Sequence, residues 1–179
     1  MTPPTRAPID ADVASDVIHR AAKAFNAHDA EAFTAIMAPD VVFIHSALPE
    51  PMHGRAEVAT TYSESFWLAF PDLAIELADG PLLHPHAPRA ALDWQVRGTH
   101  LGPLRPPGLA PSGRAFNTVA REVITIEDGL ARRVHLVMDM ADVMRQLGVL
   151  PPTGSRGEAA MMAMQRMRQL PRTLSRTRA

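Results

Sequence analysis

Residues 116–138 read FNTVAREVITIEDGLARRVHLVM and predict two antiparallel β-strands joined by a tight turn. β-Branched and other apolar residues recur on both sides of the turn, which is typical of strands. Glu127-Asp128-Gly129 lies between them, and glycine readily adopts the positive φ angle that a tight hairpin requires. The C-terminal half of the chain is therefore expected to form an antiparallel sheet.

The chain before this hairpin alternates helical patterns with short strand patterns. Asp12 and Asp29 are each placed to cap a helix, and a turn is predicted at Asp79-Gly80. The remaining predicted elements are helices over residues 12–25, 30–37, 55–69 and 140–147, and strands over residues 41–46, 73–77 and 90–99. Helices followed by a meander of long strands predict an α+β fold in which the helices cover one face of the sheet. A curved sheet of this kind leaves a pocket between its concave face and the helices, a common place for a small-molecule site.

The length of 179 residues predicts one domain with two extensions. Residues 1–11 contain three prolines and are expected to be a flexible arm, and residues 12–150 form the domain. Residues 151–179 form a basic, methionine-rich extension with a net charge of +5, against −6 for the rest of the chain. Methionines 161, 164 and 167 have helical spacing and are expected to pack against protein. Without aromatic residues to stack on bases, this basic extension does not indicate nucleic-acid binding.

Composition excludes several classes of protein. The chain has no cysteine, which excludes disulfides, thiolate metal sites and cysteine nucleophiles. The sequence contains no glycine-rich phosphate loop, and His84 and His86 lack a third ligand, so no motif indicates an organic cofactor or a metal. No secretion signal and no membrane-length apolar stretch are recognisable, so a cytoplasmic protein is expected. Lys23 is the sole lysine, and abundant arginine, alanine and proline are typical of a GC-rich bacterial genome.

Several short segments, taken in order, resemble one known family. They are FNAHDAEA at 25–32, APDVV at 38–42, FPDL at 70–73, WQVRGTHLG at 94–102, IEDG at 126–129, Asp139-Met140 and QLG at 146–148. In this order and spacing, across about residues 12–148, they resemble the SnoaL-like polyketide cyclases. That family lies within the nuclear-transport-factor-2-like superfold. The resemblance implies a cone-shaped α+β domain.

The resemblance also implies a reaction, which is the aldol ring closure of a polyketide ester without a cofactor. In that family an aspartate near the end of the last strand is the acid/base group, and Asp139 matches its position. Asp139 follows an apolar strand, where an unpaired acid is unexpected unless it is functional. It is equally well placed to cap the helix that begins at Met140.

Other candidate residues follow from strand alternation and from the family match. His135 is expected to share the cavity face with Asp139, although many relatives have tryptophan there, so it is either a second polar group or a different pocket wall. His45 lies where relatives often have histidine, at the end of the first strand, and both histidines would orient or polarise substrate oxygens. The expected substrate-binding residues are Trp94, His53, Phe66 and His100. Arg121 is expected on an exposed or interface face.

Three functions are compatible with these patterns. The first is a cyclase acting on a small hydrophobic, oxygen-rich substrate. The second is a non-enzymatic binding module of the same fold. The third is an isomerase or epoxide hydrolase that uses the same pocket, since one fold hosts many reactions. A homodimer is expected by analogy with other cone domains, and neither nucleic acid nor membrane is an expected partner.

Overall fold

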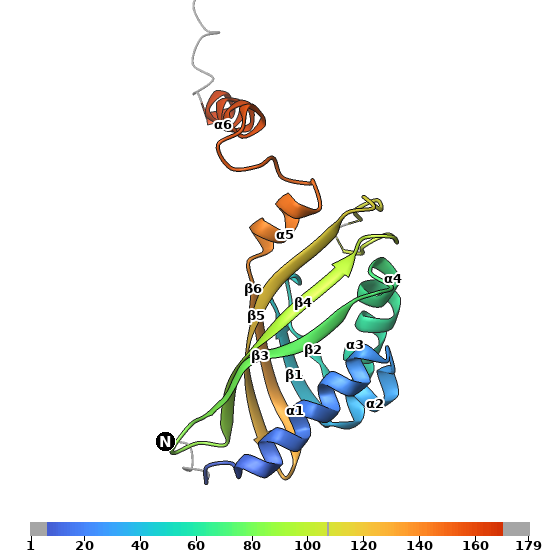
Figure 1. Cartoon of the computed structure of the whole chain (residues 1–179), viewed down its shortest axis with the longest axis vertical. Coiled ribbons are helices and arrows are strands. Elements are labelled where there is room, and N and C mark those ends of the chain that lie inside the picture. Colours follow the sequence, from blue (N-terminus) through green and yellow to red (C-terminus); the bar gives the residue numbers. More distant parts are fainter. Residues whose placement is uncertain (1–6, 107, 170–179) are drawn as a thin grey trace, which may run out of the picture.

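Helices α1 to α4 lie against the concave face of a curved sheet, and α5 and α6 follow the last strand (Figure 1). The computed structural model describes residues 7–106 and 108–169. The helices are α1 (Ala11–Asn26), α2 (Ala30–Ala35), α3 (Gly54–Thr61), the π-helical turn η1 (Tyr62–Phe66), α4 (Trp67–Ala69), α5 (Met140–Gln146) and α6 (Arg156–Gln169). The strands are β1 (Met37–His45), β2 (Met52–His53), β3 (Ala74–Leu83), β4 (Arg89–Thr99), β5 (Ala115–Glu127) and β6 (Leu130–Met138). The predicted α+β fold is confirmed.

The six strands form one sheet in the order β2-β1-β6-β5-β4-β3. Neighbouring strands are antiparallel except for β1 and β6, which are parallel. The predicted hairpin joins β5 to β6, and both Asp128 and Gly129 have positive φ angles in its turn. Alternate residues of β4 and β5 are buried, as expected where one face of a sheet meets the core.

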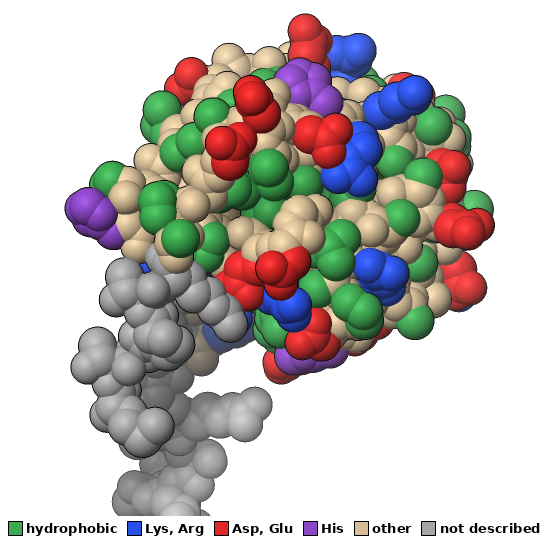
Figure 2. Space-filling view, turned by 90° about the horizontal axis from the view of Figure 1, so that it is seen from below, with side chains coloured by type: hydrophobic (Ala, Val, Ile, Leu, Met, Phe, Trp, Pro, Cys, Tyr) green, Lys and Arg blue, Asp and Glu red, His purple; other side chains and the backbone are tan. Residues whose placement is uncertain are grey.

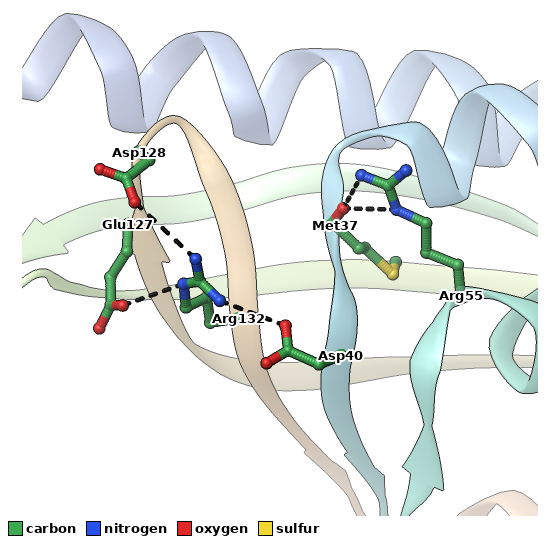
Figure 3. A network of polar contacts seen from close by, with 6 residues as sticks. All are labelled: Met37, Asp40, Arg55, Glu127, Asp128 and Arg132. Atoms are coloured by element: carbon green, nitrogen blue, oxygen red, sulfur yellow. Dashed lines mark hydrogen bonds and ion pairs between the residues drawn. The ribbon is translucent and has the colours of Figure 1, made fainter.

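The first two helices begin at aspartate caps. Asp10, rather than the predicted Asp12, caps α1, because its carboxylate accepts hydrogen bonds from the amides of Asp12 and Val13. Asp29 caps α2 as predicted. The helix predicted over residues 55–69 is present as α3, η1 and α4. Its first turn is tied to β1 by Arg55, which donates from Nε to the Met37 carbonyl at 2.7 Å (Figure 3).

The turn predicted at Asp79-Gly80 is wrong, because β3 continues through these residues to Leu83. The register with β4 shifts on both sides of Asp79, so the chain accommodates the irregularity without leaving the sheet. Gly80 has a φ of +93°, and a Cβ atom there would lie 2.8 Å from the Ala91 carbonyl oxygen. Glycine is required at this point for both reasons. The chain reverses instead between β3 and β4, over residues 84–88.

Arg132 ties the β5–β6 turn to β1 (Figure 3). Its guanidinium forms ion pairs with Asp40 at 3.2 Å, Glu127 at 3.0 Å and Asp128 at 3.8 Å. Figure 2 views the molecule from this end and shows acidic side chains interspersed with basic ones. The arginine thus compensates part of the negative charge where the first and last strands meet.

Helix α6 stands away from the sheet (Figure 1). The prediction that its methionines pack against protein is wrong within this chain, since Met164 and Met167 are 53% and 65% exposed. The last ten residues of the predicted basic extension lie outside the described residues. No helix within residues 7–106 and 108–169 combines the length and apolar character needed to cross a membrane.

Candidate active site

A cavity of about 90 Å³ lies between the concave face of the sheet and α1, α2, η1 and α5. Its walls are almost wholly apolar and come from every layer of the domain. The helical wall includes Phe25, Phe33 and Phe66, and the sheet contributes Val96, Ile124 and Leu136. Within the described part of the chain, the polar side chains that line it are His45, Tyr62, Trp94 and Glu122.

Glu122 is the charged residue of this set, and it points inward from the middle of β5. It belongs to a buried row of alternating residues, and its side chain is 9% exposed. The indole Nε1 of Trp94 donates a hydrogen bond to Oε2 of Glu122 at 3.0 Å. Burial raises the pKa of the Glu122 carboxyl to about 7, and the hydrogen bond from Trp94 offsets part of that rise. A carboxyl with this pKa accepts and returns protons readily at neutral pH.

His45 lines the cavity from the end of β1. Its ring stacks on Phe66 with a centroid distance of 4.9 Å, and the backbone amide of Ala47 donates to its Nδ1 at 3.0 Å. Burial lowers the pKa of the imidazole to about 4, because the charged form loses its hydration. The ring is therefore neutral at physiological pH.

Tyr62 opens the π-helical turn η1 and lines the same cavity. The centroid of its ring lies 5.2 Å from that of Phe66 and 6.5 Å from that of the His45 imidazole. Burial, together with the negative charge of Glu122, raises the pKa of the Tyr62 hydroxyl far above its usual value. The phenol is therefore a neutral hydrogen-bond donor at every physiological pH.

The sheet register places His45 and Glu122 on either side of Leu136. His45 pairs with Leu136 across the β1–β6 ladder, and Leu136 pairs with Glu122 across the β6–β5 ladder. All three side chains are buried on the concave face. Two strand spacings separate the backbones of His45 and Glu122 by about 10 Å. The space above Leu136 thus lies between a carboxyl and a neutral imidazole.

A family profile of SnoaL-like polyketide cyclases matches residues 15–147. The chain belongs to the SnoaL-like polyketide cyclase family. No curated protein matches the sequence.

Three solved structures are similar to this chain in fold. TsrD from Streptomyces laurentii is 24% identical with a TM-score of 0.65, and the match covers 79% of this chain and 99% of TsrD. IdmH from Streptomyces antibioticus, a candidate polyketide cyclase, is 25% identical with a TM-score of 0.61, over 75% of this chain and 97% of IdmH. A protein of ketosteroid isomerase-like fold from Catenulispora acidiphila is 11% identical with a TM-score of 0.62, and the match covers 74% of this chain and 92% of that protein.

The family resemblance assigned Asp139 to the cavity, strand alternation placed His135 on the same face, and the predicted inward orientation of both side chains is wrong. Val134 and Leu136 are the buried residues of β6, so His135 lies on the outer face and is exposed. Asp139 is exposed at the end of the strand, and its Oδ1 accepts a hydrogen bond from the amide of Asp142 at 2.9 Å. Its structural role is therefore the N-cap of α5, which was the alternative interpretation.

The other predicted residues of this SnoaL-like domain divide into two groups. His45, Trp94 and Phe66 line the cavity together. His53 is exposed at the start of α3, and His100 is fully buried outside the cavity lining, against Phe70. Arg121 lies on the outer face as predicted, where it forms two hydrogen bonds with Asp93 at 2.7 and 2.8 Å.

Sequence reasoning missed Glu122 and Tyr62. Glu122 occupies the buried phase of β5, among Phe116, Thr118, Ala120 and Ile124. A glutamate in an otherwise apolar phase of a strand was the available signal. The sequence gives a weaker indication that Tyr62 lines the cavity, because an aromatic residue on the buried side of a helix is more often part of a core.

Proposed function

We propose that this protein catalyses the intramolecular aldol ring closure of a polyketide ester, with the carboxyl of Glu122 as the acid/base group. The observation that carries the proposal is a buried carboxyl with a pKa of about 7 in the wall of an apolar cavity. Membership of the SnoaL-like family supports the substrate class. The apolar lining favours a small hydrophobic substrate whose polar atoms are few and carbonyl-like.

The chemistry requires one proton transfer in each direction. The ionised carboxylate of Glu122 removes a proton from the carbon next to a carbonyl group, and an enolate forms. The enolate carbon attacks a second carbonyl carbon of the same molecule, which closes the ring and leaves an alkoxide. Protonated Glu122 returns the proton to this alkoxide, so substrate and product are isomers and the enzyme ends in its starting state.

The hydrogen bond from Trp94 to Glu122 assists both proton transfers. Its indole N–H occupies Oε2, which leaves Oε1 for proton transfer. The same hydrogen bond favours the ionised base, while burial favours the protonated acid. A pKa near the working pH balances the two forms, as a group that acts first as base and then as acid requires.

The test is turnover of a panel of polyketide methyl esters by the wild type and by Glu122→Gln. The amide has nearly the same shape but transfers no proton, so we expect turnover to fall by at least about 100-fold with ligand binding preserved. Glu76→Gln, at an exposed glutamate of β3, is the matched control and should retain wild-type turnover.

Asp139→Asn distinguishes this proposal from the family-based assignment, because asparagine preserves the helix cap. If Asp139→Asn abolishes turnover and Glu122→Gln does not, the acid/base group is Asp139. If neither the wild type nor Glu76→Gln turns over any ester, and Glu122→Gln binds aromatic ligands as tightly as the wild type does, the protein is better described as a non-enzymatic binding module.

We also infer that two copies of the chain associate through the outer face of the sheet. Val119, Val123 and Val137 are exposed there on adjacent strands, at 47%, 36% and 46%. Light scattering should report a dimer for the wild type and a monomer for Val119→Lys/Val137→Lys. Leu68→Lys, at an exposed leucine of α4 on the helical side of the sheet, is the control and should remain dimeric. A monomeric wild type would contradict this inference.

A further inference from the structure

We propose that His45 and Tyr62 form a pair of neutral hydrogen-bond donors for one carbonyl oxygen of the bound substrate, with His45 donating from Nε2. The inference deepens the proposed function, on which it rests for the identity of the reaction. It assigns a place to the oxygen that becomes negatively charged when the neighbouring carbon loses its proton.

The tautomer of His45 follows from its backbone contact. The amide of Ala47 donates to Nδ1 at 3.0 Å, and an imidazole nitrogen that accepts a hydrogen bond carries no proton. A neutral ring then carries its single proton on Nε2. Among the described residues Nε2 has no hydrogen-bond partner, while the ring lines the cavity. The proton on Nε2 is therefore available to a ligand.

Tyr62 supplies the second donor from the opposite layer. It enters the cavity from the helical layer, whereas His45 enters from the sheet, and both rings pack on Phe66. Within the described part of the chain the Tyr62 hydroxyl has no hydrogen-bond partner either. The centroids of the two rings lie 6.5 Å apart with 72° between the ring planes, so both side chains border the same part of the cavity.

The neutrality of both donors matters because Glu122 lines the same cavity. A protonated imidazole would pair with the carboxylate, hold it ionised and weaken it as a base. A neutral N–H stabilises negative charge that develops on the substrate and leaves Glu122 free to change its protonation state. The cavity lining within the described residues contains no lysine or arginine that would take over this role.

The first experiment measures the tautomer in the resting protein and needs no substrate. Nitrogen-15 NMR of the histidine rings should show His45 with an unprotonated Nδ1 and a protonated Nε2 throughout pH 5.5 to 8, identified as the signal lost in His45→Gln. A proton on Nδ1, or a doubly protonated ring within this range, would overturn the proposal.

The second experiment uses a series of naphthols of increasing acidity as mimics of the enolate, at pH 6, in the Glu122→Gln background. Donors that stabilise negative oxygen make affinity rise with naphthol acidity. We expect Tyr62→Phe and His45→Leu each to weaken the most acidic naphthol by at least about tenfold and to flatten this trend. His45→Gln supplies an acceptor for Ala47 and a donor for the ligand, and should restore part of the affinity.

His84→Gln, at an exposed histidine beyond β3, is the control and should bind as its parent does. Absence of naphthol binding, or an unchanged trend in folded His45→Leu and Tyr62→Phe, would overturn the donor pair. Because naphthol affinity is measured at equilibrium and involves no turnover, this result is independent of ester turnover. The turnover experiment can thus contradict the proposed cyclisation while naphthol binding supports the donor pair, and naphthol binding can contradict the donor pair while turnover supports the cyclisation.

Discussion

The indole Nε1 of Trp94 on β4 donates to Oε2 of Glu122 on β5 at 3.0 Å, and the contact is diagonal across the two strands. Trp94 pairs with Ala120, whereas Glu122 pairs with Leu92, so the large indole reaches two residue pairs along the ladder, to the next pair on the same face. The contact fixes one carboxylate oxygen and partly compensates the cost of burying the charged form.

Replacing Trp94 by Phe should move the acidic limb of the pH–activity profile to higher pH. The indole N–H stabilises the ionised form of Glu122, so its loss raises the pKa of this carboxyl further above about 7. A hydrogen bond to a charged group is worth about 1.5 to 3 kcal/mol, which corresponds to a displacement of about one to two pH units. The pH dependence of kcat/KM measures the displacement, and a profile that stays in place would show that Trp94 does not tune Glu122.

Glu122 should make the fold less stable as the pH rises. Its pKa is about 7 in the folded protein and near 4.5 when unfolded, so between these values the unfolded chain releases a proton that the folded protein retains. The stability is fully present below about pH 4.5 and is lost as the pH rises through 7, by about 3 kcal/mol. Urea denaturation of Glu122→Gln and of the wild type at pH 4.5 and 8 measures this difference. Equal pH dependence in the two proteins would contradict it.

His45 should have the opposite effect over almost the same range. The pKa of its imidazole is about 4 in the folded protein and 6.5 in the unfolded chain. Between these pH values the unfolded chain binds a proton on this residue and the folded protein does not. This stability is present above about pH 6.5 and is lost as the pH falls towards 4, again by about 3 kcal/mol. His45→Gln should therefore lose less stability than the wild type on acidification from pH 7 to 4.

Comparison of both single variants with the double variant His45→Gln/Glu122→Gln completes this test. In the wild type the two contributions oppose each other between about pH 4.5 and 6.5, so each single variant should reveal the slope of the residue that is left. The double variant should return to a weak dependence on pH over this interval. Persistence of a single-variant slope in the double variant would assign it to other groups.

Asp139→Ala should lower stability without lowering turnover. The carboxylate caps α5 through the amide of Asp142, and loss of an N-cap costs about 1 kcal/mol. Asp139→Ser provides a matched control, because serine caps helices nearly as well. Thermal denaturation and ester turnover, measured on the same preparations, separate the two roles. Turnover lost in both variants would indicate that Asp139 takes part in the chemistry.

Strand alternation predicted the order of the elements well but did not settle which face of β6 is buried. β5 combines polar residues such as Asn117 and Arg121 on one side with apolar residues on the other, so its phase is unambiguous. β6 is apolar on both sides near its end, since Val137 is 46% exposed while Leu136 is buried. The phase that placed His135 and Asp139 inward was therefore not excluded by the pattern itself. Pairing with β5 decides it, and that is a tertiary effect.

The aromatic and polar side chains that line the cavity could be predicted only in part from the sequence. His45 was predicted from the family resemblance at a strand end, Trp94 was predicted from its place within a strand, and both line the cavity. The contact between Ala47 and Nδ1 of His45 depends on the local turn after β1, which no residue type encodes by itself. Tyr62 follows the buried Val58 by four residues, so regular helical periodicity places it on the buried side, but periodicity alone does not show that it borders a cavity.

The parallel pairing of β1 with β6 has a consequence for how the protein is made. β6 lies between β1 and β5 in the sheet, so a growing chain that ends before Leu130 has His45 and Glu122 on sheet fragments without a shared neighbour. Such distant pairing is slow to form and is completed late in folding. The cavity therefore forms only after β6 has been added to the sheet, and a chain truncated before Leu130 lacks it.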